Sequence, residues 1–212
     1  MSENSCGSIF NTAKEHFKRY RLRYFILTVI FIFGMFIGWG MPERLDIKNS
    51  SELSSYISDI LQNIPAAQID GKLEMTRAVY LNGISLLIIW FLGFTLIASP
   101  IVAAVLFYKG FCLGMAVSFL LTANDVQGII MILLAVLPQN IFLIPIFVIA
   151  SMLAINFSVA LLKNEQGMRR HLLKKFFRYS CCFAILFITV VLSGYIQGYF
   201  DPWLLRMFFK II

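Results

Sequence analysis

The stretch VQGIIMILLAVLPQNIFLIPIFVIASMLAINFSVALL, residues 126–162, contains no charged residue. About 20 apolar residues are enough for a helix to cross the hydrocarbon core of a bilayer, and this run is much longer. Pro138 and Pro145 interrupt it. Because proline removes a backbone hydrogen-bond donor and lipid offers no substitute partners, the pattern predicts a broken or re-entrant helix that packs against protein.

Four further charge-free runs accompany this stretch, at residues 24–41, 78–108, 110–124 and 179–200. Of the 212 residues, 59% are hydrophobic and only 14% are charged, and the mean hydropathy is +0.81. A soluble domain could not keep so many apolar side chains off its surface. The composition therefore predicts an all-α, polytopic membrane helix bundle. The longest polar stretch, at residues 42–77, is too short for a catalytic domain of ordinary size.

Basic residues are concentrated in two segments, which predicts the orientation of the chain. The leader carries five of them before the first run: Lys14, Lys18, Arg19, Arg21 and Arg23. Residues 163–178 contain six basic residues against the single acid Glu165. Positive charge beside a span is retained on the cytoplasmic side, so both segments are expected there. Residues 42–77, with six acids and four basic residues, suit the outer side.

Five net crossings satisfy this arrangement. Because Pro100 divides its run, we expect a helix near residues 81–99, a cytoplasmic turn near Lys109 and a short outward span over residues 110–122. Alternatively, this span could start before Lys109, on the far side of Pro100. An outer turn at Asn124 and Asp125 follows. Residues 126–162 then make one net crossing, because two would place the next basic segment outside.

The expected divisions of the chain follow from these crossings. They are a basic cytoplasmic leader (1–23), a first span (24–41), an outer loop with an amphipathic helix (42–78), a central helix bundle (79–162), a basic cytoplasmic loop (163–178), a last span (179–200) and an outer C-terminal segment (201–212). The N-terminus is thus expected in the cytoplasm and the C-terminus outside.

Four polar residues lie nearest the membrane interior: Lys109, Asp125, Gln139 and Asn140. Such groups can mark an ion or substrate path. We expect Lys109 and Asp125 at turns on opposite faces of the membrane. Gln139 and Asn140 can cap the helix ends opened by Pro138. A structural role is therefore favoured over transport.

Three pairs of glycines are spaced one helical turn apart: Gly34 and Gly38, Gly110 and Gly114, and Gly194 and Gly198. Small residues at this spacing let two helix backbones approach closely, and such packing supplies much of the cohesion of helices in lipid. Packing within one chain is the favoured interpretation. A homodimer formed through the first or last span is the alternative.

The outer loop contains apolar residues at helical spacing, namely Leu53, Tyr56, Ile57, Ile60 and Leu61. Asn49 with Glu52 can form a capping pair, and Pro65 closes the segment. This amphipathic helix could lie on membrane lipid or pack on the bundle, or its apolar stripe could receive a partner protein. The net acidity of the loop argues against anionic lipid as its main attraction.

The sequence offers no constellation typical of an enzyme. His16 and His171 lack Cys or carboxylate partners at ligand spacing. There is no Gly-Lys phosphate loop and no Gly-x-Ser-x-Gly elbow. We therefore expect a protein that is not an enzyme, with no cofactor, no metal and no nucleic-acid partner.

Three groups of motif residues follow one another along the chain. They are Trp90-Phe91-Leu92-Gly93 with Ser99-Pro100, then Lys109-Gly110 with Gly114 and Phe119-Leu120, then Leu137-Pro138-Gln139-Asn140 with Leu143-Ile144-Pro145. In these motifs the chain resembles the stage II sporulation protein M family. The resemblance extends over essentially the whole chain, including the basic leader, the outer loop and the C-terminal Asp201-Pro202 with Leu204-Leu205.

The resemblance implies a membrane protein of endospore-forming bacteria that works in engulfment, in the mother-cell membrane that migrates around the forespore. It implies a scaffold that recruits and anchors two peptidoglycan-degrading partners, the stage II sporulation proteins D and P. Sidedness and apolar spacing make the outer-helix residues and Pro202, Trp203 and Leu204 our candidates for the partner surface. The resemblance itself assigns these residues no role.

A transporter or permease is the alternative, because interrupted helices such as residues 126–162 commonly form binding sites at the bilayer midplane. A detectable inverted repeat, or paired charges deep within the spans, would favour it.

Overall fold

The computed structural model describes residues 21–44, 70–95, 98–123, 125–162, 169–204 and 207. Its elements are α2 (Arg21–Arg44), α4 (Gly71–Leu92), α5 (Ala98–Ala123), α6 (Asp125–Met131), the π-helical turn η2 (Ile132–Val136), α7 (Leu137–Leu162), α8 (Arg169–Tyr195) and the π-helical turn η3 (Ile196–Phe200). No strand occurs in the part of the chain described. The predicted all-α class is therefore confirmed.

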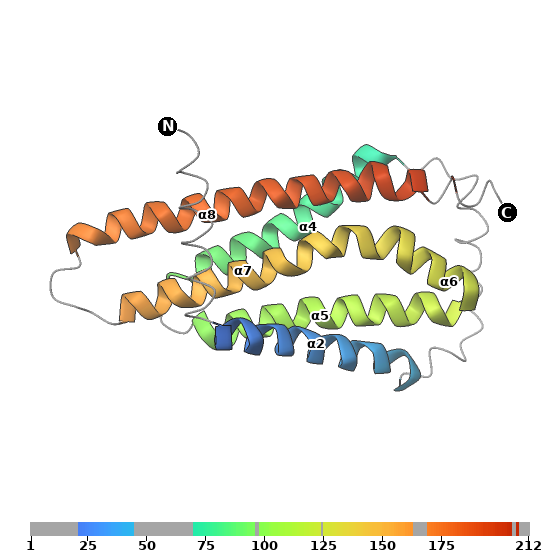
Figure 1. The fold of residues 1–212 in the computed structure, drawn as a ribbon, viewed down its shortest axis with the longest axis horizontal. Helices are drawn as coiled ribbons and strands as arrows, with labels where there is room; N and C mark the ends of the chain where they lie inside the picture. Colours follow the sequence, from blue (N-terminus) through green and yellow to red (C-terminus); the bar gives the residue numbers. More distant parts are fainter. Residues whose placement is uncertain are drawn as a thin grey trace.

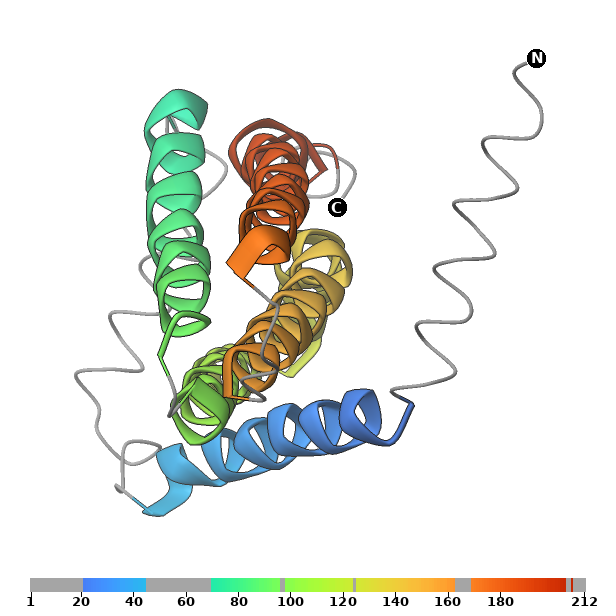
Figure 2. The same cartoon turned by 90° about the vertical axis from the view of Figure 1, so that its left-hand side faces the viewer.

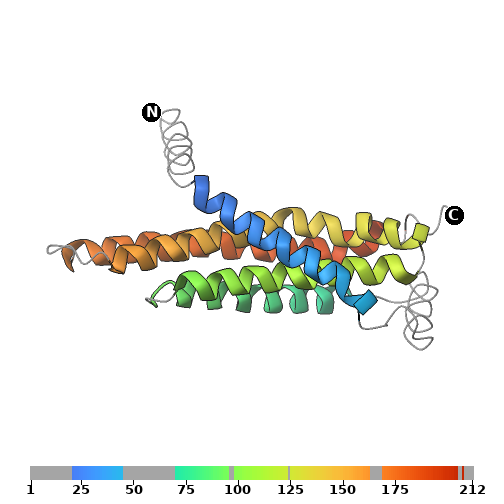
Figure 3. The same ribbon diagram turned by 90° about the horizontal axis from the view of Figure 1, so that it is seen from below.

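Five helical segments are long and apolar enough to cross a membrane: Arg21–Pro42, Gly71–Leu92, Ala98–Leu121, Gly128–Leu162 and Lys174–Leu204. They run along the long axis of the molecule, with α2 inclined to the others (Figures 1 and 3). Seen along that axis, α4, α8, α7 and α5 surround a common core, and α2 crosses the outside of α5 (Figure 2). The predicted multi-pass membrane bundle is thus confirmed.

Charges gather at the two ends of this bundle. The basic end, on the left in Figure 1, carries Arg21, Arg23, Lys174, Lys175 and Arg178. The acidic end, on the right, carries Asp70, Glu74 and Asp201 together with the basic residues Lys72 and Arg77. Between these ends, Lys109 is the only charged residue among the described side chains of the spans.

The turn between the second and third spans is not where the sequence analysis expected it. Helix α4 ends at Leu92, and residues 93–95 form a turn at the basic end. Pro100 stands in the first turn of α5, where a missing backbone donor costs nothing. Helix α5 then continues through Lys109, so the predicted turn at Lys109 and a span start at residue 110 are wrong. The third span begins before Lys109, as the alternative allowed, and it includes Pro100.

The fourth span is continuous rather than re-entrant. Helix α6, the turn η2 and helix α7 follow one another along residues 125–162, and the segment curves visibly in Figure 1. Instead of the break predicted at Pro138, the structure has a π-helical turn directly before this residue. In that turn the Leu137 N–H donates to the Ile132 carbonyl, five residues earlier rather than the four of an α-helix. Pro145 lies inside α7. One net crossing is therefore retained without an interruption of the helix.

Three other predicted boundaries are also corrected. Helix α4 begins at Gly71, inside the predicted outer loop at residues 42–78, because the Asp70 carboxylate caps it by accepting from the backbone N–H groups of Lys72 (3.0 Å) and Leu73 (3.4 Å). Helix α8 begins at Arg169, so most of the predicted basic loop at residues 163–178 is helical. The last helical segment continues to Leu204, beyond the predicted end of the span at residue 200. The predicted amphipathic helix lies outside the described residues.

The core is apolar and is shared by the four surrounding helices. Its largest fully buried apolar side chains are Leu86, Ile89, Val102, Leu106, Met152 and Val190, which come from α4, α5, α7 and α8. Leu27 and Phe31 of α2 join the same cluster. The exposed face of α4 is apolar as well, as expected where a helix meets lipid.

Candidate functional site

The tightest helix contact joins the first two predicted glycine pairs to each other. A Cβ atom on Gly34 or Gly38 of α2 would overlap the carbonyl oxygens of Phe107 and Phe111 in α5. Reciprocally, one on Gly110 or Gly114 would overlap carbonyl oxygens of α2. The four glycines therefore bring the two backbones into direct contact, which no other residue would permit.

The third pair packs the last span against α4. A Cβ atom on Gly194 would lie 2.5 Å from a methyl group of Val79, and one on Gly198 would lie 2.7 Å from the Cβ atom of Met75. All six predicted glycines thus take part in packing within the chain. A homodimer formed through these faces would have to displace this packing.

Lys109 lies in the middle of α5 and forms a polar cluster with residues of two other helices. Its Nζ atom donates to the Oδ1 atom of Asn82 in α4 at 3.0 Å, and it stands 4.7 Å from the ring centre of Phe147 in α7. A cavity of about 40 Å³ adjoins these groups and is also lined by Asn140. We call it the Lys109 cavity. A charged residue therefore reaches the interior of the membrane bundle.

Gln139 and Asn140 bond to the helix backbone near Pro138. The Gln139 side-chain amide donates to the Ala135 carbonyl at 3.2 Å, and that of Asn140 donates to the Val136 carbonyl at 2.7 Å. Both carbonyls belong to η2, directly before Pro138. Each amide thus bonds to the carbonyl four residues before it, whereas in an α-helix the missing N–H of Pro138 leaves the carbonyl of Leu134 without a donor. The predicted capping of the helix end at Pro138 stays a prediction.

The Trp90-Phe91-Leu92-Gly93 motif is the C-terminal end of α4. The Tyr179 hydroxyl donates to the Trp90 carbonyl at 2.9 Å, and the Thr95 hydroxyl donates to the Leu92 carbonyl at 2.7 Å. A Cβ atom on Gly93 would overlap that Tyr179 hydroxyl, so glycine is needed for it to approach. The motif thus closes the α4–α5 turn at the basic end.

The Tyr179→Phe substitution is expected to lower the free energy of unfolding by about 1 kcal/mol, because it leaves the Trp90 carbonyl without this donor. Thermal unfolding in detergent measures the effect. Tyr195→Phe, at an exposed tyrosine of the same helix, is the matched control and should change nothing. Equal melting temperatures for all three proteins would contradict the assigned cap.

The predicted partner residues at the C-terminal end lie at the acidic end of the bundle. Trp203 is 55% exposed and stacks on Phe200 with ring centres 5.9 Å apart, while Pro202 and Leu204 are half-buried. The neighbouring Asp201 is buried. The other predicted partner residues, Leu53, Tyr56, Ile57, Ile60 and Leu61, lie outside the described residues.

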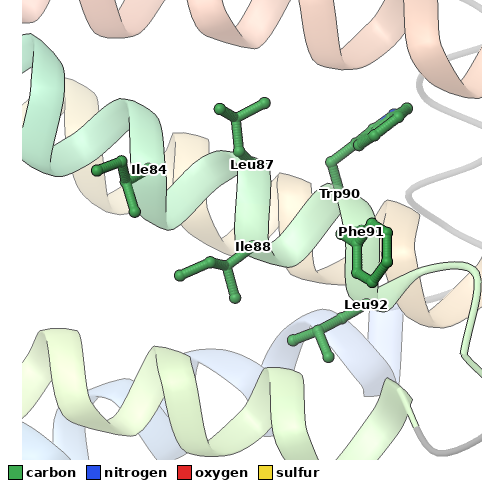
Figure 4. Close-up of a pocket in the computed structure, with 6 residues that line it drawn as sticks. All are labelled: Ile84, Leu87, Ile88, Trp90, Phe91 and Leu92. Atoms are coloured by element: carbon green, nitrogen blue, oxygen red, sulfur yellow. The ribbon is translucent and has the colours of Figure 1, made fainter.

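A shallow hollow of about 370 Å³ lies along α4 and is lined only by apolar side chains (Figure 4). They are Ile84, Leu87, Ile88, Trp90, Phe91 and Leu92. Because one membrane-spanning helix supplies all of them and almost none of the hollow's surface is polar, the indole N–H of Trp90 being its one side-chain donor, the hollow fits the acyl chains of surrounding lipid.

Several residues that build these sites were missed by the sequence analysis. Asn82 was overlooked because it stands in a charge-free run, although an amide inside a span is itself a signal of a polar contact. The cap by Tyr179, and the 2.7 Å hydrogen bond from the Ser158 hydroxyl to the Thr95 carbonyl, join residues far apart in the sequence. No spacing within one helix could have shown these contacts.

The described residues contain no group of three or more His, Cys, Asp or Glu that could hold a metal ion.

No curated protein and no solved structure matches the chain. The family model of stage II sporulation protein M matches residues 27–202, which is most of the chain and includes all five spans almost completely. The chain therefore belongs to the stage II sporulation protein M family and is a sporulation-related membrane protein.

Proposed function

We propose that this protein is an integral membrane scaffold for forespore engulfment, which recruits and anchors peptidoglycan-degrading enzymes at the septal membrane. The match of the family model over residues 27–202 is the observation that carries the proposal. By the family resemblance, the partners are the stage II sporulation proteins D and P, and the membrane is the engulfing membrane of the mother cell.

The charge distribution supports the sidedness that this function requires. Positive charge is retained in the cytoplasm, so the basic end faces the cytoplasm and the acidic end faces the cell wall. The N-terminus is then cytoplasmic and the C-terminus outside. Residues 45–69 and the end of the chain connect to the acidic end, on the side where wall hydrolases act.

Catalysis by this chain is not needed in the proposed mechanism, which is tethering. Anchoring a hydrolase beside the septal wall converts a search through the volume into a local encounter and raises its effective concentration. The close packing of α2 on α5 and of α8 on α4 supplies a rigid base for such an anchor. The outer loop and the exposed Trp203 then serve as docking points.

The Trp203→Ala substitution is expected to reduce co-purification of wall hydrolases several-fold from detergent extracts of sporulating cells, because it removes an exposed aromatic anchor. Trp39→Ala is the matched control, since Trp39 is a similarly exposed tryptophan (49%) near the acidic end of α2. Charged substitutions at Tyr56 and Ile60 test the outer loop in the same assay. Hydrolase recovery that none of these changes reduces would overturn the docking surface. Absence of any hydrolase from the wild-type sample would overturn the scaffold.

A membrane transporter is the second candidate, and one observation favours it more than the sequence did. Lys109 lies within a span rather than at a turn, and ionisable residues inside spans often mark an ion or substrate path. Its cavity is also lined by Asn140, whose amide donates to the last residue of the π-helical turn, and such turns often accompany functional sites. The cavity there is small, about 40 Å³, so a solute path would need a second conformation. Solute flux in liposomes that contain the purified protein would test this function directly.

A further inference from the structure

Lys109 carries a positive charge inside the bundle, and no described carboxylate lies beside it. It stands eleven residues after the start of α5 and fourteen before its end. At about 1.5 Å per residue this places it roughly 16–21 Å from either end, near the middle of a hydrocarbon core of about 30 Å. An ammonium group at this depth is costly unless an opposite charge accompanies it.

No acidic side chain of the described residues provides that charge. The acids whose side chains are described, Asp70, Glu74 and Asp201, all lie at the acidic end of the bundle. Glu74 precedes Asn82 by eight residues on α4, which corresponds to roughly 12 Å along the helix. The contacts of Lys109 are instead a neutral amide oxygen and an aromatic ring, which attract a cation without cancelling its charge. Cys112, one turn further along α5, also interacts electrostatically with Lys109, but a thiol in an apolar interior stays protonated and neutral.

The adjoining cavity has the size and the donors that a small anion needs. Its volume of about 40 Å³ exceeds the roughly 10–15 Å³ of such space that one water needs, so a small monatomic anion fits. Lys109 has three N–H donors, and the Asn82 amide group adds N–H donors beside them. Side chains of α2, α4, α5 and α7 complete the lining.

We propose that the Lys109 cavity binds one small monovalent anion of the size of chloride. A lipid phosphate is excluded as the source, because headgroups lie at the membrane interface, far from the middle of α5. The bound ion supplies the counter-charge that the described residues do not provide, and it joins α4, α5 and α7 through Asn82, Lys109 and Asn140.

Thermal unfolding of the purified full-length protein in detergent tests the proposal. Chloride or bromide, compared with gluconate at equal ionic strength, should raise the melting temperature by roughly 3–6 °C at about ten times the dissociation constant. Lys109→Met should abolish this halide effect. Lys72→Met, which changes an exposed lysine at the start of α4, should retain it. A halide effect that is absent from the wild-type protein, or that persists in Lys109→Met, would overturn the proposal.

A second measurement does not depend on the stability of a variant. Radioactive chloride should bind the wild-type protein saturably, near one ion per chain, and bromide but not gluconate should displace it. Binding that does not saturate, or that gluconate displaces as well as bromide does, would show that the cavity does not select a small anion.

Discussion

The Gly114→Ala substitution should lower the free energy of unfolding by roughly 1–3 kcal/mol, although alanine is the better helix former by about 1 kcal/mol. The added methyl group would overlap the Met35 carbonyl oxygen, which belongs to the α2 backbone and cannot rotate away. The two helices must therefore separate along the contact. In lipid no hydrophobic force opposes that separation, so the lost van der Waals contacts are not recovered.

Gly40→Ala is the matched control for this prediction. Gly40 lies in α2 as well, but nothing lies within 4 Å of the position that a Cβ atom would take there. This change should leave the melting temperature unchanged or raise it slightly, whereas Gly114→Ala should lower it by about 2–4 °C for each kcal/mol lost. If the two substitutions shifted the melting temperature equally, the α2–α5 contact would not depend on its glycines.

The glycine pairs show how far sequence patterns reach. Their spacing of one helical turn places both residues of a pair on one face, and this local geometry correctly predicted close packing. The spacing does not indicate which helix packs against this face. That α2 meets α5, and that the last span meets α4, depends on the arrangement of all five helices and could not be read from either segment alone.

Lys109 shows why the turn between the second and third spans was misplaced. Pro100 was interpreted as the end of a helix, but proline fits equally well in the first turn, where its missing N–H would have no partner anyway. The charged residues Lys72, Glu74 and Arg77 led to a second error, because they made the first turns of α4 look like part of the polar outer loop. The second span therefore begins and ends earlier in the sequence than predicted, and Lys109 lies within the third span.

The polar residues of the fourth span were easier to interpret. Pro138 must leave a carbonyl without its usual donor, and amide side chains directly after it can supply one. Gln139 and Asn140 donate instead to the carbonyls four residues before them, so their hydrogen bonds lie within one segment and could be expected from the local spacing. The Lys109–Asn82 hydrogen bond joins different helices and required the fold.

The Asn82→Leu substitution is expected to lower the free energy of unfolding by roughly 1.5–3 kcal/mol in halide-free buffer. It removes the oxygen that accepts from Lys109 at 3.0 Å and leaves a half-buried ammonium without it. Lys109→Met should have little effect by itself, because replacing a charge inside the bundle with an apolar side chain of similar length removes the need for a partner. The test is whether Asn82→Leu lowers the free energy of unfolding more than Lys109→Met does.

The double variant with Asn82→Leu and Lys109→Met separates electrostatics from packing. If the unpaired ammonium causes the loss, the double variant should be close to Lys109→Met, with a coupling free energy of about 1.5–3 kcal/mol. Thermal or denaturant unfolding of the four proteins gives this coupling. If Asn82→Leu costs as much with Met at position 109 as with Lys, the loss arises from packing along α4. The hydrogen bond to Lys109 would then contribute nothing measurable to the stability of the bundle.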